Sequence, residues 1–143
     1  MRIHQISVFL ENRIGQLAEI THLLAENHVD IRAISIAEST NYGIARMIVD
    51  DAPKASAILL EHGDILSMTP VWAVEVPDRP GGLAEVLSVL AENHVDVEYM
   101  YSLFTHKEGN AYMVMRISDE PVFLSTLGDR KIRIVGNDEL GLK

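Results

Sequence analysis

The chain has 143 residues, of which 48% are hydrophobic and 23% are charged, and its net charge is −9 with no cysteine. Nucleic acid and anionic membrane surfaces do not attract an acidic protein, so neither is expected as a partner. The absence of cysteine excludes disulfides and thiol chemistry and suits a cytoplasmic protein. Residues 1–7 lack the apolar core of a signal peptide, and no apolar run is long enough to span a bilayer.

The first half of the chain predicts alternating strands and helices. Leu17, Ile20 and Leu24 recur at helical spacing, and β-branched runs bounded by Gly, Asn and Ser are typical of strands. The expected elements are a strand at 3–10, a helix from 17 to about 27 that ends at Asn27 or His28, strands at 31–37 and 44–49, a helix capped by residues 50–53 and ended by Gly63, and an extended stretch at 65–76 broken by Pro70.

The second half predicts the same order of elements. A turn and helix are expected at 78–93, strands at about 97–105 and 111–117, a helix capped by residues 118–121 that runs to Leu127, and a last strand at 132–135. Each half therefore has the order βαββαβ, a split βαβ arrangement in which helices cover one face of an antiparallel sheet. Residues 137–143 are expected to form a loose acidic tail.

The two halves are copies of one another. Residues 24–30, Leu-Ala-Glu-Asn-His-Val-Asp, return unchanged as residues 90–96, at an offset of 66. At the same offset three further pairs match: Arg13 with Arg79, Gly15 with Gly81, and Gly43 with Gly109. A shared period across half the chain indicates duplication. The sequence thus predicts an α+β chain of two ferredoxin-like units, at residues 1–69 and 70–143.

A glycine turn opens the first helix of each copy. In the second copy, Gly81 and Gly82 stand between a Val-rich strand and the helix that starts near Leu83. Glycine permits backbone angles closed to other residues, and the first N–H groups of a helix suit a carboxylate or a phosphate. The alternative interpretation is a strand-to-helix turn that only needs glycine, because short glycine motifs often match by chance.

Residues 74–83, Val-Glu-Val-Pro-Asp-Arg-Pro-Gly-Gly-Leu, and the helix exit at 91–97 resemble the ACT domain, and the whole chain looks like two such domains in tandem. The first half also resembles the regulatory subunit of acetolactate synthase. The resemblance implies that a free amino acid binds where two ACT domains meet. It implies these ligand-binding positions: Asn12, Arg13, Ile14, Gly15, Gln16, Leu17, Asp30 and Ile31 in the first half, and Asp78, Arg79, Pro80, Gly81, Gly82, Leu83, Asp96 and Val97 in the second.

The chain departs from the family pattern at two kinds of position. His28 and His94 stand where members commonly have Gly, and Asp30 and Asp96 stand where they commonly have Asn. An Asp at this place suits the α-ammonium group of a ligand. In the first copy, moreover, Ile14 and Gln16 replace Pro80 and Gly82. Two possibilities follow: the two sites differ in affinity, or only one of them binds.

Metal and enzyme interpretations are weaker. His28 and His94 occupy equivalent helix ends, but no local spacing matches a known metal site. Asp50-Asp51 and Asp119-Glu120 precede helices, so capping explains them better than catalysis. Acylphosphatases share the βαββαβ fold and hold phosphate with a loop arginine, as Arg13 or Arg79 would. Their glycine-valine-glutamine-glycine loop is missing here, and no nucleophile has an adjacent base.

The sequence therefore predicts a cytoplasmic sensor that binds a free amino acid and regulates a partner enzyme, with no catalytic activity, cofactor or metal. Unpaired sheet edges are normally covered, so pairing of the two halves and a homodimer are expected. Two alternatives stay open: a regulatory subunit of an amino-acid biosynthetic enzyme such as acetolactate synthase, and an acylphosphatase-like hydrolase.

Overall fold

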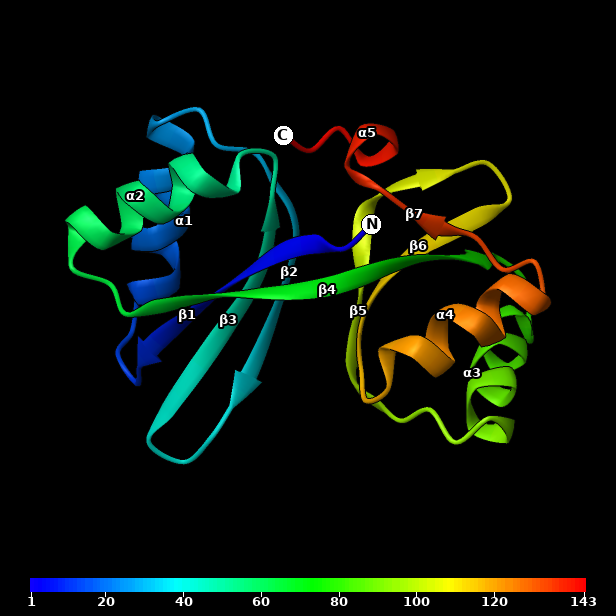
Figure 1. Cartoon of the computed structure of the whole chain (residues 1–143). Coiled ribbons are helices and arrows are strands. Elements are labelled where there is room, and N and C mark those ends of the chain that lie inside the picture. The colour runs from blue at the N-terminus through cyan, green and yellow to red at the C-terminus, as the bar shows by residue number, and fades with distance from the viewer. The chain divides into compact units, whose positions relative to one another are not determined.

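A computed structural model describes residues 1–143. The chain forms two compact units (Figure 1). The N-terminal unit contains residues 4–69 together with 141–143, and the C-terminal unit contains residues 70–140 together with 1–3. No helix has the length and apolar composition needed to span a membrane.

The N-terminal unit is a four-stranded antiparallel sheet with two helices on one face. Its elements are β1 (Ile3–Glu11), α1 (Gln16–Glu26), β2 (Ile31–Glu38), β3 (Tyr42–Val49), α2 (Ala52–His62) and the beginning of β4 (Leu66–Pro77), in the strand order β2-β3-β1-β4. Alternate residues of β1 and β3, such as Val8 and Ala45, are paired in register and face the helices. They form a closed core with Ile20, Leu24 and Leu59.

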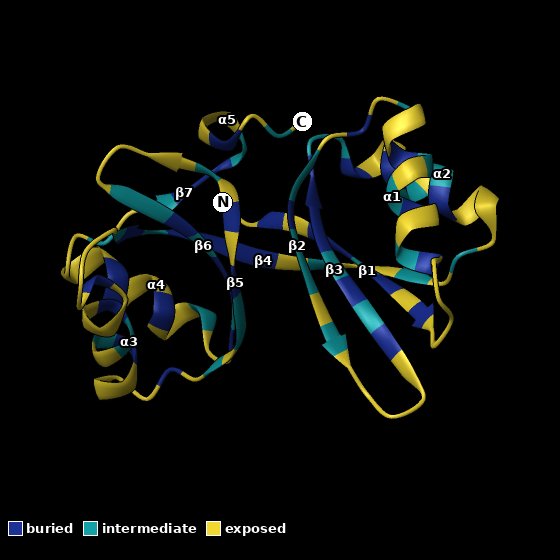
Figure 2. Ribbon diagram, turned by 180° about the vertical axis from the view of Figure 1, so that it is seen from behind, coloured by how far each residue is buried: buried dark blue, intermediate teal, exposed yellow.

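The C-terminal unit repeats this plan. Its elements are the rest of β4, α3 (Gly82–Glu92), β5 (Val97–Lys107), β6 (Asn110–Ile117), α4 (Glu120–Asp129), β7 (Ile134–Val135) and α5 (Asn137–Leu140). β6 pairs with β4 and β5, and the short β7 pairs with the other edge of β4. Trp72, Val74 and Met115 pack against Leu90 and Phe123. Figure 2 shows buried residues along the strands and on the helix faces turned toward them.

The ends of the helices follow from local chemistry. Asp51 and Asp119 accept hydrogen bonds of 3.2 Å from the backbone N–H groups of Lys54 and Val122, so the predicted capping role of these aspartates is confirmed. At the exits of α1 and α3, His28 and His94 both adopt φ of 59°, the left-handed conformation. The histidine, rather than the preceding asparagine, thus takes the position that favours glycine.

Two expectations are wrong. Pro70 does not break the extended stretch, because β4 runs continuously from Leu66 to Pro77. The pairing of β4 with β6 begins at Trp72, two residues after Pro70. The missing N–H of the proline therefore removes no hydrogen bond between these two strands. The tail is not loose, since residues 137–140 form α5. Glu139 on this helix accepts a 2.8 Å hydrogen bond from the Tyr112 hydroxyl and pairs with Arg133 at 2.6 Å.

Candidate functional site

Both glycine turns adopt the same left-handed geometry. Gly15 has φ of 87° before α1, and Gly81 has φ of 84° before α3. An L-amino acid with a side chain rarely adopts these angles, so both positions favour glycine. No side chain caps either helix. The N–H groups of each first turn therefore carry the positive end of the helix dipole without a side-chain partner, which favours an anion.

In the N-terminal unit this turn borders a cavity of about 330 Å³. It lies between the start of α1, the end of β2 and the hairpin that leads into β3, and it is lined by Leu10, Glu11, Asn12, Arg13, Gly15, Gln16, Leu17, Ala18, Ile36, Glu38, Ser39, Tyr42 and Gly43. Five of the predicted positions in this half therefore share one cavity. Ile14 is not among them, and its side chain is fully exposed.

Gln16 is the unusual residue of this cavity. It is only 8% exposed, and its Oε1 atom is buried without a hydrogen-bond donor. A buried carbonyl oxygen without a donor destabilises a protein by roughly 1–3 kcal/mol. In the C-terminal unit the equivalent residue is Gly82, where an added Cβ would overlap the carbonyl oxygen of Pro77. The sequence shows that Gln16 and Gly82 differ. It does not show that the Gln16 oxygen is buried without a donor, or that the carbonyl of Pro77 leaves no room for a side chain at Gly82.

Arg13 belongs to a chain of ion pairs beside this turn. It contacts Glu19 at 3.2 Å, and the other oxygen of Glu19 lies 3.2 Å from Nε2 of His62. Nδ1 of His62 lies 2.8 Å from Asp64. The hydrogen bond to Asp64 and its charge, followed by the weaker effect of Glu19, raise the pKa of His62. This cluster therefore links the end of α2 to α1 most strongly when His62 is protonated.

The stabilising effect of His62 is expected to depend on pH. Its folded-state pKa is raised above the ordinary value of 6.5, so its contribution to the free energy of unfolding is fully present below about pH 6.5. It is lost as the pH rises through the raised value. His62→Gln is thus expected to lower the melting temperature more at pH 5.5 than at pH 9. In an Asp64→Asn background this difference between the two pH values should shrink, and an undiminished difference would contradict the assigned cause.

The other predicted positions lie at the far end of the helix. Asp30 and Asp96 follow the exits of α1 and α3, each about 16 Å from the glycine turn of the same unit, because an 11-residue helix rises about 1.5 Å per residue. Their backbones are tied to the ends of β3 and β6, where Asp50 Oδ1 and Ser118 Oγ accept the N–H bonds. No single unit therefore brings Asp30 and Ile31, or Asp96 and Val97, to its own turn.

The turn of the C-terminal unit borders a larger groove of about 840 Å³. Arg79, Pro80 and Gly81 line it, whereas Asp78, Gly82 and Leu83 do not. Arg79 is bound to Glu85 through two hydrogen bonds of 2.8 and 2.9 Å. The opposite side of the groove is the segment 130–133, which the sequence analysis did not single out. A comparison of the two copies would have pointed to it, because Lys131 and Arg133 correspond to the uncharged Gly63 and Ile65.

Comparison with known proteins gives one family and several solved structures. The model of the family described as "ACT domain pair" matches residues 1–140. Protein BT0572 from Bacteroides thetaiotaomicron is 35% identical in sequence and superposes with a TM-score of 0.90. The match covers 99% of this chain and 96% of the BT0572 chain. The search of curated proteins finds no match.

Two further structures share the fold at lower identity. The ligand-free regulatory subunit of aspartate kinase from Thermus thermophilus is 16% identical, covers 90% of this chain and 91% of its own, and has a TM-score of 0.65. The corresponding subunit from Thermus flavus is 18% identical, with coverages of 90% and 93% and a TM-score of 0.59. At these identities the likeness shows the fold alone.

Proposed function

Because this chain belongs to the family of ACT domain pairs, we propose that it is a regulatory protein that binds a free amino acid at a glycine turn and transmits the bound state to a partner enzyme. The observation that carries the proposal is the turn of the N-terminal unit. There the left-handed Gly15 opens an uncapped helix beside a cavity of about 330 Å³, a volume within the range of small-molecule sites.

The chemistry of the cavity suits an amino acid. The first-turn N–H groups of α1 hold the carboxylate, and the helix dipole reinforces this contact. Apolar surface from Leu10, Leu17 and Ile36 surrounds the ligand side chain. The unpaired Oε1 of Gln16 supplies an acceptor for an N–H or O–H group of the ligand. A polar amino acid is therefore favoured over an apolar one of the same shape.

The α-ammonium group is assigned to Asp30 or Asp96 of a second ACT unit. Asp30 directly precedes β2, and its side chain is 64% exposed and paired with Arg32 at 3.2 Å. The ammonium group of a ligand held by another turn can replace Arg32 in this exposed ion pair with little loss of stability. This arrangement is the reason to propose a homodimer. The partner is proposed to be an enzyme of amino-acid metabolism. The hydrolase alternative is disfavoured, because the glycine-valine-glutamine-glycine loop of acylphosphatases is missing and no nucleophile has an adjacent base.

The test is a thermal-shift panel of the twenty amino acids with the full chain. A ligand at about 100 times its dissociation constant stabilises the folded state by about 2.7 kcal/mol, which corresponds to roughly 2–8 °C for domains of this size. One or a few amino acids are expected to give this shift. Calorimetry then compares the isosteric pairs Thr with Val and Asn with Leu, and the polar member should bind about tenfold tighter or more.

Two results would count against this function. If none of the twenty amino acids shifts the melting temperature and calorimetry shows no heat of binding, the amino-acid site is wrong. If an amino acid binds but the polar and apolar members of each pair bind equally, the site stands and the role of Gln16 is wrong. Gln16→Met, which keeps the length of the side chain and removes its acceptor, is the matched variant for the second outcome.

A further inference from the structure

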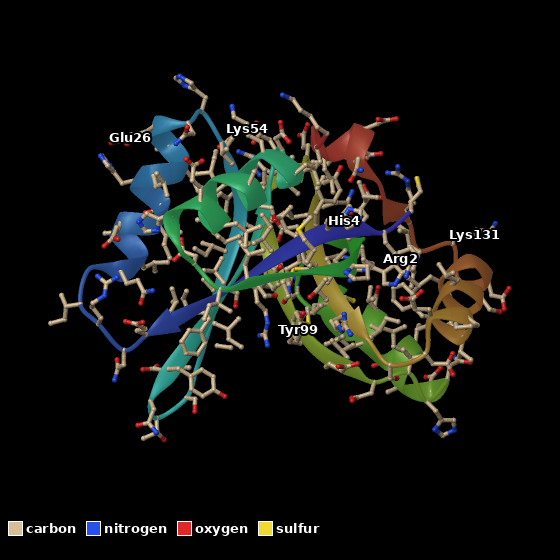
Figure 3. The ribbon with its side chains drawn as sticks, turned by 60° about the vertical axis from the view of Figure 1, so that its left-hand side comes forward. Arg2, His4, Glu26, Lys54, Tyr99 and Lys131 are labelled. Carbon is tan, nitrogen blue, oxygen red and sulfur yellow. The ribbon has the colours of Figure 1, made fainter.

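The groove of the C-terminal unit carries a concentration of positive charge. It runs between the outer face of α3 and the segment 130–133, and its cationic lining consists of Arg79, Arg130, Lys131 and Arg133. These are four of the 12 Lys and Arg residues in a chain whose net charge is −9. Figure 3 labels Lys131 on the segment that follows α4. The lining also includes Glu75, Glu85 and Glu92, so four cations and three anions leave the groove with a net charge of +1. A positively charged groove in a protein whose overall net charge is −9 indicates an anionic ligand.

The duplication shows which cations of this groove belong to one copy only. In the second helices the two copies are offset by 68, as the caps Asp51 and Asp119 show, so Arg130, Lys131 and Arg133 correspond to His62, Gly63 and Ile65. Arg130 pairs with Glu92 on α3, much as His62 pairs with Glu19 on α1. Lys131 and Arg133 have no charged counterparts, and these two cations are therefore the departure from the plan that the two units share.

The cations of the groove are available to a ligand. Arg79 and Arg130 pair with Glu85 and Glu92, but all four side chains are more than half exposed, and exposed ion pairs stabilise a protein by only about 0–1 kcal/mol. An anion can therefore replace the glutamates with little loss of stability. Lys131, in the left-handed conformation with φ of 57°, has no carboxylate partner.

A hydrogen-bond acceptor lies in the same groove. Glu75 on β4 is held by Arg133 at 3.1 Å, and its side chain is only 11% exposed. Its Oε1 atom is buried without a hydrogen-bond donor, although the ammonium of Lys107 lies 3.6 Å away. A hydroxyl or amino group of a ligand would give this oxygen a donor. The groove thus combines an anion-binding side with an acceptor, and its volume exceeds that of the cavity in the N-terminal unit.

We propose that this groove binds a phosphate-bearing small molecule of nucleotide size. Arg79, Arg130 and Lys131, together with the first turn of α3, hold the phosphate, since guanidinium groups and helix N-termini match its several oxygens. Glu75 accepts a hydrogen bond from a hydroxyl or amino group of the same molecule. The net charge of −9 excludes a long polyanion, whose further phosphates the rest of the surface would repel. This site shares no lining residue with the proposed amino-acid cavity of the N-terminal unit.

The experiment measures binding of AMP, ATP and inorganic phosphate to the full chain by calorimetry in low salt, with acetate as a carboxylate control. The test variant is Arg130→Gln with Lys131→Asn, since asparagine tolerates the left-handed conformation. The control variant, Lys54→Asn with Arg116→Gln, removes the same charge elsewhere; Lys54 lies on α2 (Figure 3). We expect a nucleotide to bind wild type and control alike and the test variant at least tenfold more weakly.

Three outcomes would overturn the proposal: no binding of any phosphate compound, equal binding by the two variants, or nucleotides that bind no tighter than inorganic phosphate or acetate. A Gly15→Asp variant separates this site from the amino-acid site, because it changes only the turn of the N-terminal unit. It should bind the nucleotide as the wild type does.

Discussion

Gly82→Ala is expected to lower the free energy of unfolding by about 3 kcal/mol. A Cβ at this position overlaps the carbonyl oxygen of Pro77 and lies 2.9 Å from its carbonyl carbon. Both atoms belong to the backbone, so no flexible side chain can move aside. Overpacking of this kind typically destabilises by about 1–3 kcal/mol, and occasionally by more. Urea unfolding followed by circular dichroism measures the change.

The equivalent residue of the first copy supplies the control. Gln16→Ala shortens a side chain where a Cβ is already present, and it also removes the buried oxygen without a donor. The loss of packing and the removal of that oxygen oppose one another, so a change within about 1 kcal/mol is expected. If Gly82→Ala unfolds at the same urea concentration as the wild type, the close approach of Pro77 is not what requires glycine.

Gly15→Asp is expected to abolish the amino-acid-induced thermal shift while the protein stays folded. A Cβ at Gly15 meets nothing within 4 Å, so the substitution fits sterically, although φ of 87° strains any side chain by roughly 1–2 kcal/mol. The carboxylate places a negative charge where the ligand carboxylate binds. Near a helix N-terminus that charge favours folding by roughly 0.3–1 kcal/mol and so offsets part of the strain.

Gly15→Asn is the matched control, because it has the same shape and backbone strain without the charge. It should keep most of the thermal shift. Gly81→Asp makes the same test in the C-terminal unit, where φ is 84° and a Cβ again has open space. If Gly15→Asp and Gly81→Asp, alone and combined, keep the full shift, the glycine turns are only structural and the amino acid binds elsewhere.

The sequence by itself determined the features that depend on neighbours along the chain. The offset of 66 showed the duplication, hydrophobic spacing predicted the βαββαβ order, and the ACT resemblance and the fold class are confirmed. The caps at Asp51 and Asp119 were predictable, because a capping side chain accepts its hydrogen bond from an N–H group no more than three residues further along the chain. The glycine turns were predictable for the same reason, since a left-handed backbone angle depends on the steric properties of the residue itself.

Only the tertiary structure decided which distant segments meet, because such contacts depend on packing across the sheet. The buried oxygen of Gln16, the need for glycine at Gly82 and the docking of α5 through Glu139 all involve partners outside the local pattern. Asp30 and Gly15 are close in sequence, yet a rigid helix separates them within the unit. The groove has the same origin: α3 and the segment 130–133 are far apart in the chain and become its two sides only when the C-terminal unit folds.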